Sequence, residues 1–194
     1  MDDIITKIRK CAFCATLPLG ANPVVQLHPD SKIVIVGQAP GKRVHETGIP
    51  WNDRSGDTLR QWLGVTAEQF YGPVNFSIMP VGFCYPGKGK SGDLPPRPEC
   101  AKLWHPQITG LFTNQPLIIL IGQYAQKYYL GKNFRNGLTD TVSHYEDYLP
   151  EYFVLPHPSP RNQHWPIKNP WFIREVIPRL QQIVSAHLNA TSSP

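Results

Sequence analysis

Four cysteines are the first residues whose type and spacing could carry chemistry. They occur as Cys11-x2-Cys14 and, 69 residues later, Cys84-x15-Cys100. Two thiolates in a CxxC turn can converge on one metal, and four thiolates suit either tetrahedral zinc or an iron–sulfur cluster. The alternative is an incidental CxxC with two buried free cysteines. A redox-active CxxC is disfavoured, because Cys11 follows no strand of a βαβ unit.

Two short motifs that could act on a ligand follow apolar runs of the chain. GQAPG (37–41) follows the run 32–36, and HPSP (157–160) follows the run 151–155. Taken alone, a glycine-rich turn after a strand is also compatible with phosphate binding, and a histidine before proline with a structural turn. A nucleotide-phosphate hydrolase is disfavoured, because Lys42 is followed by Arg43 and not by the Ser or Thr of a phosphate loop.

The elements that must position these motifs can be predicted from the hydrophobic pattern. Apolar runs predict buried strands at 32–36, 75–82, 116–121 and 151–155. Helical spacing predicts helices at 56–63 with Ser55 as N-cap, at 99–112, at 122–130, and at 170–187 with a kink at Pro178. The segment 84–100 is too rich in proline and glycine for regular structure, so we expect a long loop there.

Strands that alternate with helices predict an α/β protein. We expect a three-layer α/β/α sandwich with a central four-stranded parallel sheet, formed as a single domain over residues 1–194 with a frayed tail at 190–194. Ligands bind such sheets outside the carboxyl ends of the strands. Elaborate loops start there at Gly37, Phe83 and Pro156, which places the candidate site among them.

Composition restricts the partners only weakly. The net charge of +5 and the pI near 9.1 favour an anionic partner. No run approaches the roughly 18 consecutive apolar residues of a membrane helix, and the first residues, MDDIITKIRKC, lack the apolar centre of a signal peptide. We therefore expect a cytoplasmic monomer that does not associate with membranes.

The motifs taken together resemble those of the bacterial and archaeal iron–sulfur uracil-DNA glycosylases, family four of the uracil-DNA glycosylase superfamily. The resemblance covers most of residues 8–160. That family has a first motif GEAPG, then an acidic-Thr-Gly segment and an aromatic, matched here by GQAPG, by 46–48 and by Trp51. HPSP matches the second motif, and the cysteines occur in the same order.

The resemblance implies a uracil-DNA-glycosylase-like fold and an activity. The protein would hydrolyse the N-glycosidic bond of uracil or another deaminated base in DNA, leaving an abasic site. A 4Fe-4S cluster would be bound by Cys11, Cys14, Cys84 and Cys100, with zinc as the alternative. The rival function is that of a catalytically silent, metal-containing nucleic-acid-binding protein on the same fold.

The resemblance also assigns candidate residues to a flipped base. Such a base needs a flat wall and groups that read its edge. Trp51 would supply the wall, and the backbone amides around Gln38 and Ala39, after Gly37, would donate to the base. His157 would donate to the negative charge that develops on the leaving base. The alternatives are that Trp51 belongs to the core and that His157 only bonds a neighbouring carbonyl.

The carboxylate that activates water is the least defined part of the predicted site. The best-known family of the superfamily has GQDPY, whose aspartate is replaced here by Ala39. Asp53 lies in a segment, 52–56, that resembles the Gly-Asp-x-Ser-Gly of iron–sulfur family five, and its alternative is to cap the following helix. Glu46 is the second candidate, with a solvated loop position as its alternative.

Base recognition departs from the family pattern. Relatives read uracil with an asparagine at the end of the second strand, whereas residues 79–83 here read MPVGF and contain no amide side chain. We therefore expect either another deaminated base or an amide from Asn52 or Asn169. This gap, with the missing motif aspartate, supports the silent alternative.

The predicted DNA contacts are basic residues at the rim of the site. Phosphate binding needs positive charge there, and Arg161 occupies the place where relatives insert a side chain into the duplex. The residues assigned to DNA are Lys88, Lys90, Arg161, His164 and Lys168.

Overall fold

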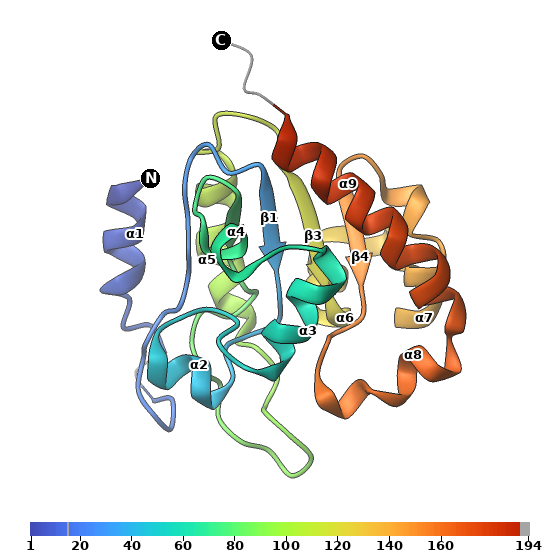
Figure 1. Cartoon of the computed structure of the whole chain (residues 1–194). Helices are drawn as coiled ribbons and strands as arrows, with labels where there is room; N and C mark the ends of the chain where they lie inside the picture. Colours follow the sequence, from blue (N-terminus) through green and yellow to red (C-terminus); the bar gives the residue numbers. More distant parts are fainter. Residues whose placement is uncertain (15, 191–194) are drawn as a thin grey trace.

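The computed structural model describes residues 1–14 and 16–190 and contains a central parallel sheet (Figure 1). Its strands are β1 (Ile33–Val36), β2 (Phe76–Ile78), β3 (Leu117–Ile121) and β4 (Tyr152–Leu155). They run in the order β2-β1-β3-β4, with every pairing parallel. Ile33 lies opposite both Phe76 and Leu117, which sets the register of the centre. The predicted four-stranded parallel sheet is confirmed.

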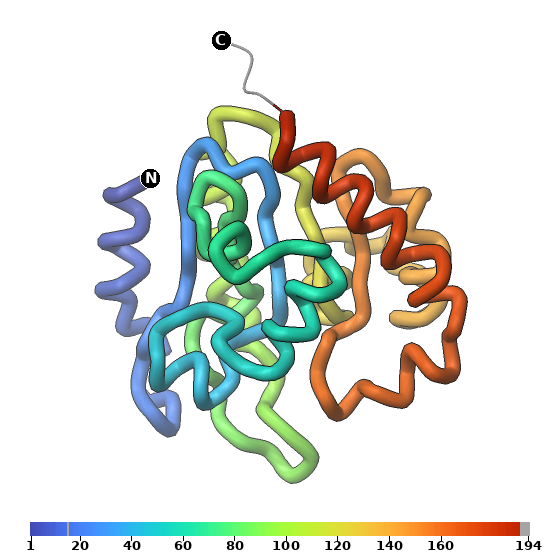
Figure 2. Tube along the Cα trace, in the orientation of Figure 1, coloured from blue at the N-terminus to red at the C-terminus, as the bar shows by residue number. Residues whose placement is uncertain are grey.

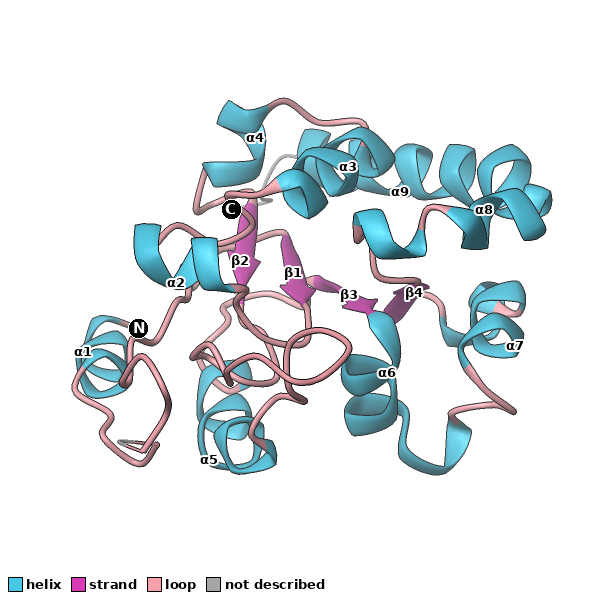
Figure 3. Ribbon diagram, turned by 90° about the horizontal axis from the view of Figure 1, so that it is seen from below, coloured by secondary structure: helices cyan, strands magenta, loops and turns pink. Residues whose placement is uncertain are grey.

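Helices cover both faces of this sheet, as the view along the strands shows (Figure 3). The α-helices are α1 (Asp2–Arg9), α2 (Lys42–Thr47), α3 (Arg54–Leu63), α4 (Ala67–Tyr71), α5 (Pro98–Thr109), α6 (Gly122–Leu130), α7 (Leu138–Ser143), α8 (His164–Lys168) and α9 (Ile177–Asn189). Shorter helical turns are η1 (Gly131–Asn133), η2 (Tyr145–Tyr148), η3 (Pro160–Asn162) and η4 (Phe172–Val176).

Successive side chains of β1 enter two separate cores. Ile33 and Ile35 pack with apolar residues of α3, α4 and α9. Val34 and Val36 pack instead with residues of α1, α5 and α6. Because side chains alternate across a strand and both faces are covered, every position of β1 is apolar and fully buried. The two cores create the predicted three layers.

The strands end at one edge of the sheet, where the long loops gather. In Figure 1 the arrows of β1 and β4 point toward the foot of the molecule. Figure 2 shows the green trace of the segment between β2 and α5 projecting there. The loop 37–53 after β1 and the loop that begins at Pro156 after β4 leave the same edge. This edge is where a ligand site is expected.

The second strand is shorter than the predicted 75–82. It ends at Ile78, because Pro80 has no amide hydrogen to continue the ladder. The chain beyond it still bonds to the first loop: Val81 N–H donates to the Gly37 carbonyl (2.9 Å) and Gly82 N–H to the Gln38 carbonyl (2.8 Å). These bonds fix the GQAPG turn against the second loop.

Two helices differ in detail from their predictions. Ser55 is not the N-cap of α3; the cap is Asp53, whose Oδ1 accepts from Gly56 N–H at 2.9 Å, while Ser55 is buried in the first turn. The predicted helix 170–187 is helical from Pro170 as expected, but passes through the π-helical turn η4 before it continues as α9 from Ile177. Pro178 cannot donate to an i−4 carbonyl, which accounts for the change of register beside it.

The remaining expectations concern the ends and the connections of the chain. The long irregular loop is confirmed from 84 to 97, where a bridge between Lys88 and Asp93 closes a small hairpin. Most of the predicted frayed tail, 191–194, lies outside the described residues. Within residues 1–14 and 16–190, no helix has the length and apolar character needed to cross a bilayer.

Candidate active site

A pocket at the carboxyl edge of the sheet brings the predicted loops together. We call it the base pocket, after the flipped base that the sequence analysis predicts as its ligand. Its lining includes Gly37, Gln38, Ala39, Gly41, Trp51, Asp53 and Ser55 from the first loop and α3, Pro80, Ser91, Gly92 and Asp93 from the second loop, and His157, Ser159, Arg161 and Asn162 from the third. Three segments far apart in the sequence therefore meet around one space, as the strand-end rule requires.

His157 enters the base pocket as a neutral ring. Burial lowers its pKa to about 4, against the opposing effect of the nearby Asp53 carboxylate. The ring lies 5.5 Å from the Trp51 ring, centroid to centroid. Asn162 Nδ2 donates to the His157 carbonyl at 3.0 Å, which fixes the backbone of the HPSP turn. A neutral imidazole offers one N–H donor without bringing charge.

Trp51 is held in an unusual backbone conformation. Its φ is 55°, in the left-handed region that non-glycine residues seldom adopt. Two glycines make room for it: a Cβ at Gly37 would lie 2.9 Å from the indole Cζ2, and a Cβ at Gly56 only 1.8 Å from the Trp51 carbonyl oxygen. The indole is half-buried, packs against the core and also lines the pocket. Packing against the core and access to the pocket are thus compatible at this residue.

Asp53 divides its two carboxylate oxygens between two tasks. Oδ1 accepts from Gly56 N–H and caps α3. Oδ2 lies on the pocket side, 3.9 Å from where a Cβ on Gly41 would stand. The cap therefore leaves one oxygen available to a water or a ligand. Helix capping and a catalytic role are compatible at this position.

Asp93 was missed by sequence reasoning. It lies in the hairpin of the second loop and accepts a hydrogen bond from the Tyr85 hydroxyl at 3.4 Å. Its Oδ2 would lie 3.7 Å from a Cβ added to Gly41, and the Oδ2 of Asp53 would lie 3.9 Å from the same Cβ. The sequence signal for Asp93 is an aspartate in a glycine-rich loop that follows a strand. The predictions for this loop included only its cysteines and its DNA-binding lysines.

Pro80, from the stretch 79–83 in which the resemblance predicts a base-reading asparagine, lines the wall of the base pocket. Its carbonyl is held by His105 Nε2 at 3.1 Å. Because a carbonyl can only accept, that nitrogen carries the hydrogen, and Nδ1 accepts from the Tyr129 hydroxyl at 2.8 Å. Burial lowers the pKa of His105 to about 4, in agreement with this neutral form. The wall is thus rigid but has no side-chain donor.

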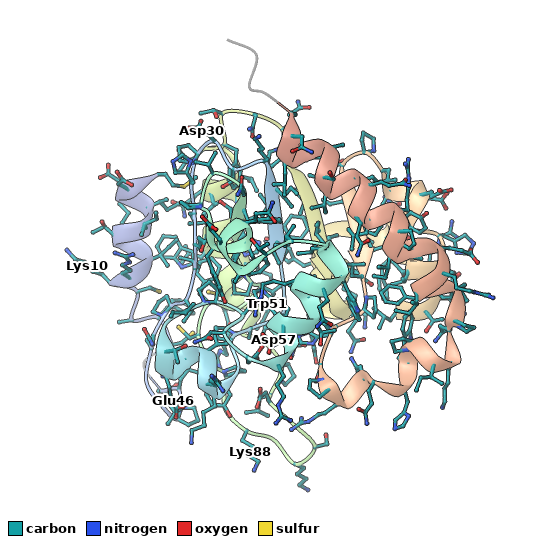
Figure 4. The ribbon with its side chains drawn as sticks, viewed as in Figure 1. Lys10, Asp30, Glu46, Trp51, Asp57 and Lys88 are labelled. Atoms are coloured by element: carbon teal, nitrogen blue, oxygen red, sulfur yellow. The ribbon has the colours of Figure 1, made fainter. Side chains whose placement is uncertain are left out.

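Three predicted residues lie outside the base pocket. Glu46 is exposed on α2 and pairs with Lys42 at 3.6 Å. Figure 4 shows it apart from Trp51, which lies beside α3. Asn169 Nδ2 donates to the Trp165 carbonyl at 2.9 Å, and Asn52 is not among the lining residues. Neither amide substitutes for the missing asparagine in this arrangement.

Of the predicted DNA-binding residues, Arg161 lines the base pocket, whereas Lys88, Lys90, His164 and Lys168 do not. Lys88 and Lys90 are exposed on the projecting hairpin, where Figure 4 labels Lys88. His164 and Lys168 are exposed on α8. Arg161 Nη1 donates to the Ser91 carbonyl at 3.2 Å, so this side chain links the third loop to the hairpin.

All four cysteines line a second cavity, behind the loop that carries Pro80. Phe83 N–H donates to Cys100 Sγ at 3.4 Å. The pKa of the Cys84 thiol is raised to about 11 and that of Cys100 to about 12, mainly by burial and in part by the neighbouring cysteines. Among the described residues, no group of three or more His, Cys, Asp or Glu is arranged to bind a single metal ion.

Comparison with known proteins adds the family. Residues 24–181 match the family described as the Uracil DNA glycosylase superfamily. The chain belongs to this superfamily. Every lining residue of the base pocket falls within the matched span, whereas Cys11 and Cys14 precede it. The superfamily membership and the α/β sandwich predicted from the resemblance are both confirmed.

One relative within the uracil-DNA glycosylase superfamily is similar over most of its length. It is the Type-4 uracil-DNA glycosylase of Thermotoga maritima, 27% identical over 166 residues, which cover 82% of this chain and 81% of the relative. The similarity therefore includes the sheet and its loops and is not confined to one motif.

Proposed function

We propose that this protein is a base-excision-repair glycosylase that hydrolyses the N-glycosidic bond of uracil or another deaminated base in DNA and leaves an abasic site. We expect it to act as a monomer in the cytoplasm. The observation that carries the proposal is the meeting of Gln38, Trp51, Asp53 and His157 in one pocket, inside the span that matches the superfamily.

The charges of the base pocket suit this reaction. Breaking the bond pushes negative charge onto the base and positive charge onto the sugar. The neutral His157 can donate a hydrogen bond to the base without having to lose a proton, and the Gln38 and Ala39 amides would assist it. The free oxygen of Asp53 would stabilise the sugar cation or activate water. Trp51 would stack on the extruded base.

We expect the base pocket to read the base through the acceptors and donors that it presents. Pro80 offers the pocket no side-chain donor, while Asp93 at the rim offers an acceptor. Deaminated bases carry ring N–H groups that such an acceptor can read. The substrate class therefore includes hypoxanthine and xanthine beside uracil.

Four thiolates can hold either a 4Fe-4S cluster or zinc, and the resemblance to the iron–sulfur glycosylases favours the cluster. All four cysteines line one cavity, and Cys11, Cys14 and Cys84 all raise the pKa of Cys100, so the sulfurs lie near one another. Cys11, Cys14, Cys84 and Cys100 would bind the cluster, and the bound group would anchor the loop that carries Pro80 and Asp93.

A base-release assay tests the activity. Purified protein is incubated with labelled single- and double-stranded DNA containing uracil, hypoxanthine or xanthine, and alkali then cleaves any abasic site. We expect strand cleavage with at least one of these bases. DNA binding without cleavage of any substrate would favour the silent binding protein.

Metal analysis tests the cofactor separately. We expect brown protein containing iron and acid-labile sulfide, and a Cys84→Ser variant with much less of both. Colourless protein with stoichiometric zinc would overturn the cluster.

A further inference from the structure

A third cavity adjoins the base pocket along the HPSP turn, and we call it the flanking cavity. It is lined by Arg54, Thr58 and Trp62 of α3, by Trp165 of α8 and by prolines of the turn. His157, Ser159 and Asn162 line both this cavity and the base pocket. A ligand that fills the base pocket could therefore continue into the flanking cavity without leaving the surface.

Two indoles form a fixed aromatic wall in the flanking cavity. The Trp62 ring meets Phe172 edge to face at 4.9 Å, and the Trp165 ring meets the same Phe172 at 5.3 Å. Phe172 is fully buried, and Trp165 Nε1 donates to Thr139 Oγ1 at 3.0 Å. Both indoles are only half-buried. A flat ligand would therefore find a preorganised surface, at little cost in side-chain entropy.

The flanking cavity also differs from the base pocket in charge. Its lining contains no Asp or Glu, whereas the base pocket contains Asp53 and Asp93. Arg54 is exposed and has no ion-pair partner among the described residues. Since His157 is neutral, Arg54 carries the formal charge of this lining. A ring surface beside a free cation suits a nucleotide, with its flat base and its phosphate.

We propose that the flanking cavity binds the nucleotide next to the extruded one in the same DNA strand. Its base stacks on Trp62, and its phosphate pairs with Arg54. This inference rests on the proposed function, because it takes the extruded nucleotide to occupy the base pocket. It predicts that the protein senses the neighbouring base and not only the damaged one.

A binding experiment with altered strands tests the flanking cavity directly. Fluorescent single strands carry a hydrolysis-resistant deoxyuridine analogue, and an abasic spacer replaces its neighbour on the 5′ side, on the 3′ side or on neither. Base stacking on an aromatic side chain supports a loss of about tenfold in affinity when the stacked base is removed. We expect this loss for one of the two sides and not for the other. Equal binding of all three strands would overturn the inference.

Matched tryptophan variants separate stacking from packing. Trp62→Leu should bind all three strands alike, while Trp62→Phe should keep the preference for a neighbouring base. Trp171 also packs edge-on against Phe172, but it does not line the cavity, so Trp171→Leu should keep the preference as well. If Trp171→Leu removed the preference as fully as Trp62→Leu, packing alone would explain it and the proposal would fail.

A surface variant covers the case in which Trp62→Leu does not fold. Arg54→Gln changes an exposed side chain, and should weaken binding and lower the slope of log Kd against log salt by about one. An unchanged slope would contradict the phosphate contact. These binding measurements require no turnover, so they can be compared with base release. Binding that depends on the neighbouring base, without base release, would support the flanking cavity and contradict the glycosylase activity. Base release without dependence on the neighbouring base would support the activity and contradict the flanking cavity.

Discussion

In the base pocket, His157 offers a neutral hydrogen-bond donor and Asp53 offers a carboxylate acceptor. Their environments differ: burial keeps the imidazole uncharged, whereas the Asp53 carboxylate lies at the start of a helix whose amides it caps. Each side chain can therefore be tested by a replacement that keeps part of its chemistry.

Replacing His157 should slow base release without abolishing DNA binding. Removing one preorganised donor to a developing negative charge typically costs about 10²–10³-fold in rate. We expect a loss of this size for His157→Ala and a smaller one for His157→Gln, whose amide can still donate. Single-turnover base release measures the rate, and fluorescence anisotropy measures the binding. Wild-type release by His157→Ala would remove this residue from the site.

The two tasks of Asp53 can be separated by comparing asparagine with alanine. Asparagine caps a helix about as well as aspartate, while alanine loses about 1 kcal/mol. Asp53→Asn should therefore unfold like the wild type in urea, and Asp53→Ala should be less stable. Both should release base slowly, because both lack the charge. If Asp53→Asn released base normally, capping would be the whole function of this residue.

Some of the residues that line the base pocket could be predicted from the sequence, and others could not. Gln38 and His157 lie close behind β1 and β4, so their meeting at one edge could be foreseen from the fold class, whereas Trp51 was assigned through the resemblance. The positions of Glu46, Asn52 and Asn169 could not, because spacing along a loop does not determine which side chains face inward. Asp93 depends on a hairpin that brings it back toward Gly41, and no local pattern indicates that return.

At the scale of elements, the contact between α3 and the preceding loop is the tightest constraint near the site. Gly56 lies in the first turn of α3, directly against the Trp51 carbonyl. The left-handed backbone of Trp51 needs this contact, since any side chain at Gly56 would displace it.

Gly56→Ala should destabilise the protein and disturb the base pocket together. An added methyl at 1.8 Å from a carbonyl oxygen forces a backbone shift, and overpacking of this kind costs about 1–3 kcal/mol. The midpoint temperature of thermal unfolding and the rate of base release should both fall. Gly110→Ala is the matched control, because its new methyl would meet nothing closer than 3.6 Å. Equal effects of the two variants would contradict the role of the Trp51 contact.

Helices and strands could be predicted where burial restricts the residues to apolar types. The segments of β1, β3 and β4 are buried on both faces, so they appear as continuous apolar runs. The predicted end of β2 was wrong, because Pro80 interrupts the hydrogen-bond ladder inside an apolar stretch. Helices α2, α4 and α8 have six residues or fewer and bury few side chains, so they carry no long periodic pattern.

At the scale of the whole molecule, two buried histidines link stability to pH. The pKa values of His105 and His157 are both lowered from 6.5 to about 4. The unfolded chain thus binds more protons than the native state between these values, so stability is fully present above pH 6.5 and is lost as the pH falls toward 4.

Urea unfolding between pH 5 and 7 measures this loss. We expect the free energy of unfolding to be level near pH 7 and to decrease below 6.5, by up to about 1.4 kcal/mol per pH unit for each histidine. His105→Gln should show a shallower decrease, because one of the two groups no longer titrates. A wild-type curve that stayed flat down to pH 5 would contradict the lowered pKa values.

The loop between Cys84 and Cys100 begins next to one wall of the base pocket and carries another part of it. Pro80 lines the base pocket, Gly82 and Phe83 line the cysteine cavity, and Asp93 returns to the pocket rim. With the proposed cluster bound by these cysteines, iron shortage would release the segment that carries Asp93, while the bonds that hold Pro80 and the first loop would remain. Nutrient supply would then set repair capacity without any change in gene expression, and a preparation purified from iron-starved cells would be mistaken for a catalytically dead relative.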